Sequence, residues 1–456
     1  MSSLAIIVLA AGKGTRMKSD LAKVLHPLAG VPMLSFTLDL ARSLRPDRLV
    51  VVVGAQRDLV KERFAAKGVI FVDQEEQLGT GHAVLMAAPA LEDFQGMVLI
   101  LCADVPLLKE ATVRNFLKSH ADGRATVSVL ITRLEDPRGY GRILREESGH
   151  LLRIVEEKDL PPGEEAIKEI NTGIYCVESS FLFEALSSLS NQNAQGEYYL
   201  TDIVEKASLQ GKRAIGFLAE DSNEVMGINT RLDLARAGEW FRQKIAERHM
   251  LAGVTLIDPK TTYIDQEVKI GRDTVIYPNC YLCGKTSLGE NCVVEPGCKV
   301  TDTKVGNFVT IKASSVIAES VIEDHVDVGP FAHLRPQTVL REGSRIGNFV
   351  EVKKSIVGRG TKANHLSYIG DATLGEKVNI GAGTITCNYD GRTKHPTIIE
   401  NGVFIGSNTE LVAPLKIGRG SIIGAGSTIT KEVPPDTLAV ARSRQVHYKK
   451  RTQRKD

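Results

Sequence analysis

The chain has 456 residues, and at roughly 100–200 residues per domain this length predicts two or three domains. Hydrophobic residues make up 43% of it, charged residues 25%, and the formal net charge is +2, so nothing indicates binding to nucleic acid or a membrane surface. The first apolar run has no basic leader and is shorter than the ~20 residues of a membrane span, which predicts a cytoplasmic protein. The odd number of cysteines, seven, favours free thiols in a reducing compartment over disulfides, and over a zinc site at the isolated pair Cys280 and Cys283.

Residues 1–228 alternate between aliphatic runs and segments whose apolar residues have helical spacing. The aliphatic runs at 4–9, 49–53 and 98–101 each end close to a glycine or an aspartate. Such alternation predicts an α/β domain with a mostly parallel, Rossmann-like sheet. Ligands bind at the carboxyl ends of the strands in these sheets, so we expect the chemistry directly after the three runs. Residues 229–251 are typical of a linking helix, with a longer excursion of the first domain as the alternative.

Residues 252–456 have a different sequence pattern, in which aliphatic–glycine pairs recur at spacings that are often multiples of six residues. The pairs begin at residues 270, 288, 305, 328, 346, 357, 369, 374, 380, 405, 417 and 423. This hexapeptide period predicts a parallel β-helix, in which short strands form flat walls around a thin aliphatic core. The alternative is a set of scattered strands in a β-sandwich, but such strands would not hold a six-residue phase over this length.

Two segments of this half depart from the repeat. The phase breaks between Gly381 and Ile405, where the polar run 386–392 predicts a loop that leaves the coil and serves function. The segment from Arg442 to Lys455 is rich in lysine and arginine, which predicts a solvated basic tail at the C-terminus.

A glycine-rich turn follows the first aliphatic run. Residues 9–17 read Leu-Ala-Ala-Gly-Lys-Gly-Thr-Arg-Met, and lysines follow at 18 and 23. Such a turn lets backbone N–H groups approach phosphates, whose charge nearby lysine and arginine neutralise. It is neither a Walker loop nor the dinucleotide fingerprint, since the first pattern is absent and Met17 replaces the third glycine of the second. We interpret it as another kind of phosphate-binding turn, with an ordinary strand–helix turn as the alternative.

This turn resembles the signature of the sugar-1-phosphate nucleotidyltransferases. The match continues through the segments 77–83, 139–142, 154–157, 169–173 and 193–199. Together with the hexapeptide half and the segment 379–391 it covers nearly the whole chain, which is similar to the family that combines an N-acetylglucosamine-1-phosphate uridyltransferase with a glucosamine-1-phosphate acetyltransferase. The resemblance implies a left-handed parallel β-helix in the second half and a role in making UDP-N-acetylglucosamine, a precursor of peptidoglycan and of lipopolysaccharide.

The resemblance implies a first site that binds UTP, N-acetylglucosamine-1-phosphate and Mg²⁺. Arg16 and Lys23 would act on phosphates in catalysis, and Asp104 and Asn229 would hold the metal. The residues implied for UDP-N-acetylglucosamine are Leu9, Ala10, Ala11, Gly12, Lys23, Gln74, Gly79, Thr80, Gly141, Glu156, Asn171 and Asn229. The chemistry agrees, because uridylyl transfer spreads negative charge over phosphate oxygens and needs cations rather than a covalent nucleophile.

One position departs from the family pattern at this site. Cys102 and Ala103 precede Asp104 where the best-known members have tyrosine and glycine. The aspartate is kept, so metal binding is still expected. Nucleotide contacts at positions 102 and 103 are then expected from the backbone.

The resemblance implies a second site, on the β-helix. Arg335, Lys353, Tyr368 and Asn379 would bind glucosamine-1-phosphate, and His365 would be the general base. The residues implied for acetyl-CoA are Ala382, Asn388, Tyr389, Ser407, Ala425 and Arg442. An amine must lose a proton before it attacks a thioester, and histidine titrates near neutral pH, so the role is chemically reasonable. A lone histidine is more often a surface residue, which is the interpretation adopted for His333.

The proposed acetyl-site residues are scattered along the coils from Arg335 to Arg442, which one chain would not gather around a small substrate. We therefore expect a homotrimer with sites shared between chains. Three alternatives stand beside the bifunctional interpretation. The chain could be a single-function nucleotidyltransferase with a structural β-helix, another hexapeptide acyltransferase with an inactive first domain, or a non-catalytic regulator. The intact turn 9–23 and the motifs around His365 and Asn388 argue against them.

Overall fold

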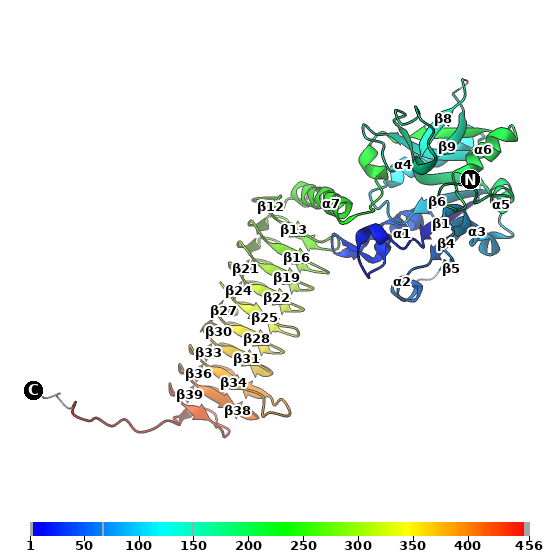
Figure 1. Ribbon diagram of the computed structural model, residues 1–456. Coiled ribbons are helices and arrows are strands. Elements are labelled where there is room, and N and C mark those ends of the chain that lie inside the picture. Colours follow the sequence, from blue (N-terminus) through cyan, green and yellow to red (C-terminus); the bar gives the residue numbers. More distant parts are fainter. Residues whose placement is uncertain (1–2, 66–67, 148, 451–456) are drawn as a thin grey trace, which may run out of the picture. The chain divides into compact units, whose positions relative to one another are not determined.

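The computed structural model describes residues 3–65, 68–147 and 149–450 (Figure 1). The chain divides into two compact units, Met1–Glu239 and Trp240–Asp456, each of which is described by itself. The division falls within one helix, α7 (Arg231–Leu251), which covers most of the span expected to link the domains. Among the described residues, none of the helices has both the length and the apolar character that crossing a membrane requires.

The first unit is built on one large sheet. Its main strands, in spatial order, are β11 (Ala214–Leu218), β7 (Val127–Arg133), β10 (Glu169–Glu178), β6 (Met97–Cys102), β1 (Leu4–Ala10), β4 (Arg48–Val53) and β5 (Val69–Asp73). Strand β10 runs antiparallel to both of its neighbours, and the other pairs on this path are parallel. A hairpin of β8 (Arg142–Arg145) and β9 (Leu151–Val155) extends from β10. The mostly parallel α/β sheet expected from the aliphatic runs is thus confirmed.

Helices cover both faces of this sheet, which is why its central strands are aliphatic throughout. Successive strand residues point to opposite faces, so Ile6 and Ile7 of β1 belong to two different cores. The core around Ile7 is closed by α3 (Thr80–Leu85), α5 (Ser179–Ser187) and α6 (Asp202–Leu209). The core around Ile6 is closed by α1 (Met33–Ser43), α2 (Arg57–Phe64) and α4 (Glu110–Asp122).

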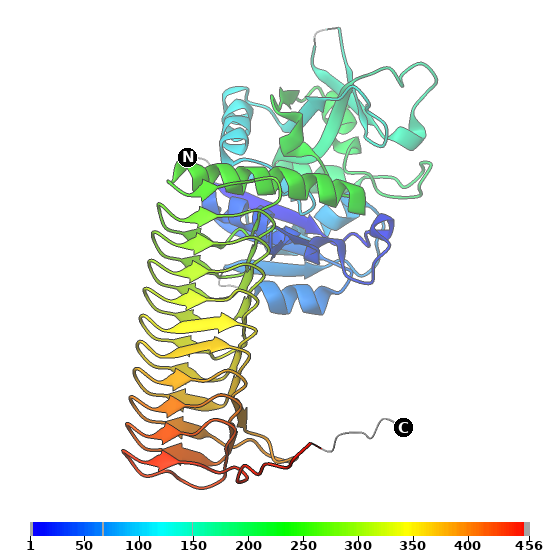
Figure 2. The same ribbon diagram turned by 90° about the vertical axis from the view of Figure 1, so that its left-hand side faces the viewer.

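The second unit is a parallel β-helix with three flat walls (Figures 1 and 2). In the described part of the chain, the first wall runs from β12 (Thr255–Leu256) to β41 (Leu438–Ala439), the second from β13 (Tyr263–Ile264) to β40 (Thr428–Ile429), and the third from β14 (Lys269–Ile270) to β38 (Leu415–Ile417). Most coils take 17 or 18 residues, as the pairing of Val275 with Val293 and of Val293 with Thr310 shows. The hexapeptide period therefore corresponds to one wall and one corner.

The interior of the β-helix combines aliphatic side chains with buried hydroxyls at the corners. Inward residues such as Val328, Leu334 and Val352 are fully buried. At the corners, buried serine and threonine hydroxyls donate to main-chain carbonyls, as Thr338 does to the Arg335 oxygen at 2.7 Å and Ser355 to the Lys353 oxygen at 2.8 Å. These bonds satisfy carbonyls that no strand pairs where the chain turns.

The cysteines of the β-helix also lie along this interior. Cys280, Cys292 and Cys298 are buried, and the thiol of Cys280 donates to the Glu295 carbonyl at 3.2 Å. All seven cysteines of the chain are free thiols. Within the described ranges, no cluster of three or more histidine, cysteine, aspartate or glutamate residues could hold a metal ion.

One coil is longer than the others. Asn379 of β33 (Asn379–Ile380) pairs with Phe404 of β36 (Phe404–Ile405), a step of 25 residues, so the predicted loop is a true insertion. It is closed by a bridge between Tyr389 and Lys394 and by Asp390, whose carboxylate accepts the N–H groups of neighbouring loop residues. Asp390 also contacts the His395 ring at 2.8 Å. Of the basic tail, residues 442–450 follow the last strand without regular structure, and Arg451, Arg454 and Lys455 lie outside the described residues.

Because strands of the two units do not pair with one another in the described structure, we expect the units to fold independently. Fragments 1–250 and 252–456, purified separately, should each show one cooperative thermal transition, measured by circular dichroism. Each transition should lie within about 10 °C of a transition of the full chain. A fragment that stays unfolded at low temperature would contradict this prediction.

Candidate active sites

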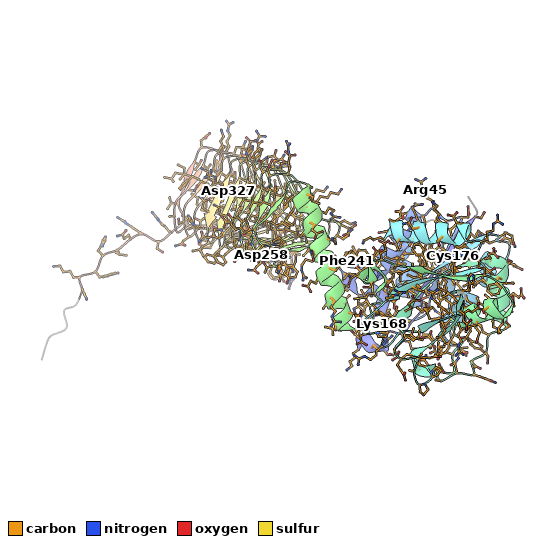
Figure 3. All side chains as sticks on the ribbon, turned by 90° about the horizontal axis from the view of Figure 1, so that it is seen from above. Arg45, Lys168, Cys176, Phe241, Asp258 and Asp327 are labelled. Carbon is orange, nitrogen blue, oxygen red and sulfur yellow. The ribbon has the colours of Figure 1, made fainter. Side chains whose placement is uncertain are left out.

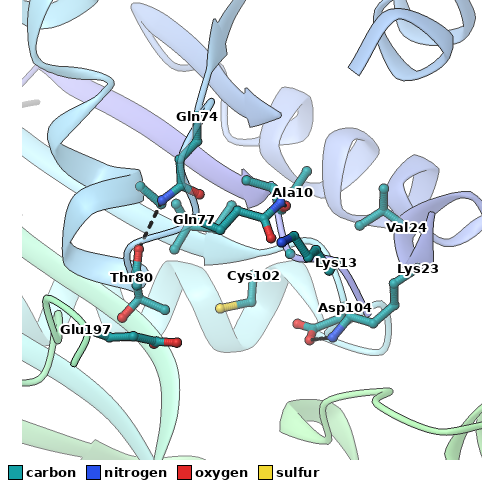
Figure 4. A pocket seen from close by; sticks show the side chains of 15 residues that line it. Ala10, Lys13, Lys23, Val24, Gln74, Gln77, Thr80, Cys102, Asp104 and Glu197 are labelled. Carbon is teal, nitrogen blue, oxygen red and sulfur yellow. Dashed lines mark hydrogen bonds and ion pairs between the residues drawn. The ribbon is translucent and has the colours of Figure 1, made fainter. Parts of the chain in front are cut away.

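The first site is a pocket of about 480 Å³ at the carboxyl ends of β1 and β6, where ligands of parallel sheets are expected (Figure 4). The residues lining it are Leu9, Ala10, Ala11, Gly12, Lys13, Lys23, Val24, Gln74, Gln77, Gly79, Thr80, Ala83, Cys102, Asp104 and Glu197. Sequence motifs far apart in the chain therefore meet in one cavity.

The glycine-rich turn forms one side of this pocket. Gly14 has a left-handed φ of 63°, and a Cβ at this position would lie 2.6 Å from the Cβ of Lys23. Glycine is therefore required for the turn to pack against the segment that carries Lys23. At Gly12 an added Cβ would meet nothing within 4 Å, so this part of the backbone faces open space where a phosphate could approach.

Two cationic and two oxygen-bearing side chains converge at the edge of the pocket. The Lys23 ammonium forms an ion pair with Asp104 (Figure 4). It also donates to Asn229 Oδ1 at 3.0 Å. Arg16 donates to the same Asn229 oxygen at 2.9 Å. Four residues from three separate segments thus share one cluster, in which the Lys23 ammonium contacts oxygens of both Asp104 and Asn229.

Backbone contacts fix this cluster. The Ile228 N–H donates to the Asp104 carbonyl at 2.8 Å, which brings the segment before α7 against the end of β6. The next residues form a capping box: Asp233 Oδ2 accepts the Thr230 N–H at 2.8 Å, and Thr230 Oγ1 accepts the Asp233 N–H at 3.1 Å. Asp233 also accepts the Asn229 N–H at 3.1 Å, so the start of the helix determines where the Asn229 amide lies.

Two glutamines shape the opposite part of the pocket. Gln77 Nε2 donates to the Ala11 carbonyl at 2.8 Å and so ties the glycine-rich turn to the segment before α3. Gln74 is buried and donates to the Gly79 carbonyl at 3.1 Å (Figure 4). Thr80 Oγ1 accepts the Leu200 N–H at 3.2 Å. The two residues Gln74 and Thr80, expected to frame the nucleotide, are therefore held by main-chain partners.

Gly141, Glu156 and Asn171 lie outside the lining of this pocket, and two of them, Gly141 and Asn171, adjoin it through Cys102. The Cys102 thiol donates to the Gly173 carbonyl at 3.3 Å, and the Gly173 N–H donates to Asn171 Oδ1 at 3.0 Å. The Asn171 N–H in turn donates to the Gly141 carbonyl at 2.9 Å. Burial raises the pKa of Cys102 to about 12, so its thiol stays protonated as a donor, and burial also raises the pKa of Glu156.

Four of the six proposed acetyl-CoA residues, Ala382, Ser407, Ala425 and Arg442, lie with His365 along one corner of the β-helix, between the first and second walls. His365 ends β30 (Lys362–His365), and its Nδ1 contacts Asn348 Oδ1 of the preceding coil at 2.8 Å. Later coils follow on the same corner: the Gly383 N–H donates to the Leu366 carbonyl, the Asn408 N–H to that of Ala382 and the Gly426 N–H to that of Ser407. Arg442 completes the column, with its guanidinium donating to the Ala425 carbonyl at 2.6 Å. We call this set, His365, Ala382, Ser407, Ala425 and Arg442, the corner column.

Three of the four proposed sugar-phosphate residues, Arg335, Lys353 and Tyr368, lie on the second wall and its far corner. Lys353 ends β28 (Glu351–Lys353) and pairs with Gly370 of β31 (Tyr368–Gly370). A Cβ on Gly370 would lie 2.4 Å from Tyr368 Oη and 2.8 Å from Asn388 Nδ2, so the Tyr368 ring reaches along the wall toward this corner. Arg335, one coil earlier, is paired with Glu351 at 2.8 Å.

The remaining residues of the second site are divided between walls. Asn379 projects outward from the first wall, with Ile380 beside it buried in the core. Asn388, expected near acetyl-CoA, donates to Asp371 Oδ2 at 2.5 Å and so belongs to the sugar-phosphate corner. Tyr389 is exposed on the inserted loop, and His333 is exposed on the second wall. Figure 3 draws the side chains along the β-helix, with Asp327 of the first wall labelled.

Several residues of both sites were missed by the sequence analysis. Lys13, Gln77 and Glu197 line the first pocket, although each lies in or beside a quoted motif. At the second site, Asp371 contacts Lys353 at 3.3 Å, and Lys394 of the inserted loop lies close enough to Lys353 that its pKa is lowered by that contact and by the neighbouring charge. Only the charge of Lys394 within a loop predicted to be functional could have indicated it.

Comparison with known families agrees with this division of the chain. Residues 5–241 match the family described as Nucleotidyl transferase. Residues 256–343 match the family described as GMPPB C-terminal domain, and residues 396–431 match Bacterial transferase hexapeptide (six repeats). The first match covers the sheet unit and the other two cover parts of the β-helix.

Relatives match the chain from end to end. The Bifunctional protein GlmU of Geotalea uraniireducens (strain Rf4) is 53% identical over 448 residues, which are 98% of this chain and 98% of the relative. That of Pelobacter propionicus is 52% identical over 98% of this chain and 97% of the relative. That of Carboxydothermus hydrogenoformans is 51% identical over 97% of this chain and 98% of the relative. This likeness confirms the predicted resemblance: the chain belongs to the GlmU family of bifunctional enzymes, which join a uridyltransferase to an acetyltransferase for UDP-N-acetylglucosamine synthesis.

Proposed function

We propose that the two reactions take place at the two sites described above. At the β-helix, glucosamine-1-phosphate would be acetylated by acetyl-CoA. At the sheet unit, UMP would pass from UTP to the resulting N-acetylglucosamine-1-phosphate with release of pyrophosphate. The observation that carries this assignment is the convergence of Arg16, Lys23, Asp104 and Asn229 beside the glycine-rich turn. UTP and acetyl-CoA are cytoplasmic metabolites, so we place the enzyme in the cytoplasm.

In the uridylyl transfer, a phosphate oxygen of the sugar phosphate attacks the α-phosphorus of UTP, and the bond to pyrophosphate breaks. Leu9, Ala10, Ala11 and Gly12 would hold the uridine with Gln74, Gly79 and Thr80. Lys23 and Arg16 would neutralise the negative charge that grows on the phosphate oxygens. Gly141, Glu156 and Asn171 would contact the N-acetylglucosamine moiety, and two of them, Gly141 and Asn171, adjoin the pocket through Cys102.

The oxygens of Asp104 and Asn229 suit Mg²⁺. Both contact one cation, the Lys23 ammonium, so a carboxylate and an amide oxygen already converge on a cationic position. Mg²⁺ prefers oxygen ligands and often takes only one or two from the protein, which fits this pair. When bound, the metal would supply charge stabilisation to the triphosphate. Lys23 would then turn from the carboxylate toward a phosphate.

The variant Asp104→Ala should abolish pyrophosphate release, because it removes the only carboxylate of the proposed metal pair. Thiol release from acetyl-CoA should stay within about twofold of wild type, since the corner column is intact. Both activities are measured on the same preparation, which makes acetyl transfer the control for folding. Loss of both activities in a variant with an unchanged melting temperature would contradict separate sites.

In the acetyl transfer, the 2-amine of the sugar attacks the thioester carbonyl and the bond to the coenzyme A sulfur breaks. The contact of His365 Nδ1 with Asn348 Oδ1 favours the tautomer whose Nε2 lone pair can take the amine proton. In the described structure the Ala382 N–H donates to no protein acceptor, and the adjacent Gly383 is bonded to Leu366 beside His365. That N–H is our candidate for stabilising the tetrahedral oxyanion.

The variant His365→Ala should lower acetyl transfer by roughly 10²–10⁴-fold, the usual cost of losing a general base. Uridylyl transfer from supplied N-acetylglucosamine-1-phosphate should be unchanged. Asn348→Ala is the matched variant: it should cause a smaller loss, because the ring stays but is no longer oriented. Full acetyl transfer in His365→Ala would remove this residue from the mechanism.

We also propose that the active form is a homotrimer. Apolar side chains are exposed on the outer walls, including Ile356 and Ile398 of the third wall and Phe404 and Ile422 of the first. A second copy of the same surface would cover them, and cyclic symmetry closes such an assembly. Asn379 and Lys353 point outward from different walls, so one chain cannot bring both to one small substrate, whereas two facing chains can.

This arrangement predicts complementation between inactive variants. Asn379→Ala and Lys353→Ala, mixed in equal amounts and refolded together, should regain about a quarter of wild-type acetyl transfer, because one site in four would combine two intact walls. Each variant refolded alone is the control. Light scattering that gives a monomer mass at assay concentration would refute the trimer, and a trimer without recovery would place both residues on one chain.

A further inference from the structure

Asp371 occupies a central place in the sugar-phosphate corner, although neither the motifs nor the chemistry described above assign it a role. It follows Gly370 at the end of the second wall, and its side chain is only 10% exposed. Its carboxylate reaches two neighbouring coils. On one side it pairs with Lys353 at 3.3 Å and approaches Lys354 at 3.9 Å, and on the other it accepts the Asn388 amide at 2.5 Å.

The backbone of Asp371 joins the same coils. Its N–H donates to the Lys353 carbonyl at 3.0 Å, and its carbonyl accepts the Thr397 N–H at 3.2 Å, directly after the inserted loop. Asn388 begins that loop, and its carbonyl accepts the His395 N–H at 2.8 Å. Asp371 therefore links the lysine of one coil to both ends of the loop that carries Lys394, through its carboxylate at Asn388 and through its carbonyl at Thr397.

We propose that Asp371 is the positioning residue of the acetyltransferase site, which holds Lys353 and the loop of Lys394 so that both ammonium groups face the phosphate of the sugar substrate. The inference rests on the proposed role of Lys353. Two ammonium groups side by side repel each other, and a partly buried carboxylate beside them makes their common position stable. The pKa of Lys394 is lowered by its contact with Lys353 and by that charge, while the charge of Asp371 opposes the lowering.

The sequence offers a matched control for this position. Asp302 lies on the same corner four coils earlier, with a φ of 47° against 49° for Asp371, and its N–H likewise donates to a carbonyl of the preceding coil. Among the residues that the structure describes, its carboxylate accepts a hydrogen bond only from the Lys285 N–H, at 2.9 Å. Glu319 occupies the corner next to Asp302 with a φ of 44°, so glutamate is also tolerated in this conformation.

The test compares Asp371→Asn, Asp371→Glu and Asp302→Asn in the full chain, with uridylyl transfer as the control for folding. Asp371→Asn should raise the KM for glucosamine-1-phosphate about tenfold or more, the size expected for losing one charge-assisted hydrogen bond. The KM for acetyl-CoA should change less than twofold. Asp371→Glu should recover part of the loss, and Asp302→Asn should behave as wild type.

The pH dependence separates positioning from a purely structural role. The charged and titratable groups around the carboxylate are Lys353, Lys354, Lys394, Arg335, Glu351 and Tyr368. Without Asp371, a lysine of the pair loses its proton at lower pH, so the KM for the sugar phosphate should begin to rise at lower pH than in wild type. If the KM begins to rise at the same pH in wild type and in Asp371→Asn, the proposal is contradicted.

Two outcomes overturn the inference and remain distinct from failure of the proposed function. Removing a carboxylate alone would strengthen the attraction of a phosphate, so a lower or unchanged KM in Asp371→Asn would mean that Asp371 does not position Lys353. In a double variant, Asp371→Asn should raise the KM for glucosamine-1-phosphate little beyond the value of Lys353→Ala alone, because both changes act through the Lys353 ammonium. If Lys353→Ala itself leaves the KM unchanged, the proposed binding role of Lys353 fails instead.

Discussion

The stacking of parallel strands at a period of 17 or 18 residues is the constraint on which the second unit depends. Each coil bonds only to the coils before and after it, so a residue's wall and corner follow from its position in the repeat. The corner column exists because His365, Ala382, Ser407 and Ala425 keep one phase through successive coils. The same constraint forces the seven or so extra residues between Asn379 and Phe404 outward, because an insertion on a wall would shift every later strand.

The first unit assembles its site by a different route. Its cavity opens where β1 and β6 end, and three segments are brought there by main-chain contacts: Gly14 against Lys23, Ile228 against Asp104, and the capping box of α7. The charged cluster is therefore set by the backbone rather than by its own ion pair. In a site proposed to bind and release a triphosphate, such a framework would let Lys23 and Asp104 exchange partners without moving the segments that carry them.

The sequence predicted the architecture well, because both periodicities are strong. The continuous aliphatic runs correctly predicted the central strands of the sheet, and the hexapeptide period correctly predicted the β-helix. The resemblance placed Arg16, Lys23, Asp104 and Asn229 in one site, and their contacts agree. It could not place Asn388, which lies with Lys353 rather than with the corner column, because the insertion breaks the phase that would have given its corner. Asp371 was missed since a corner aspartate is ordinary in such repeats, and only the contacts to neighbouring coils set it apart.

The corner column also has a length. Its five residues occupy successive coils, and strands in a sheet lie about 4.8 Å apart, so His365 and Arg442 are separated by about 19 Å along the stack. If coenzyme A lies along this corner, as proposed above, its thioester would reach His365 only when the rest of the carrier is long enough to meet Arg442. A shorter thioester could present the same acetyl group and still make no contact with Arg442. Selection among acyl donors would then depend on the length of the donor relative to the number of coils that it spans.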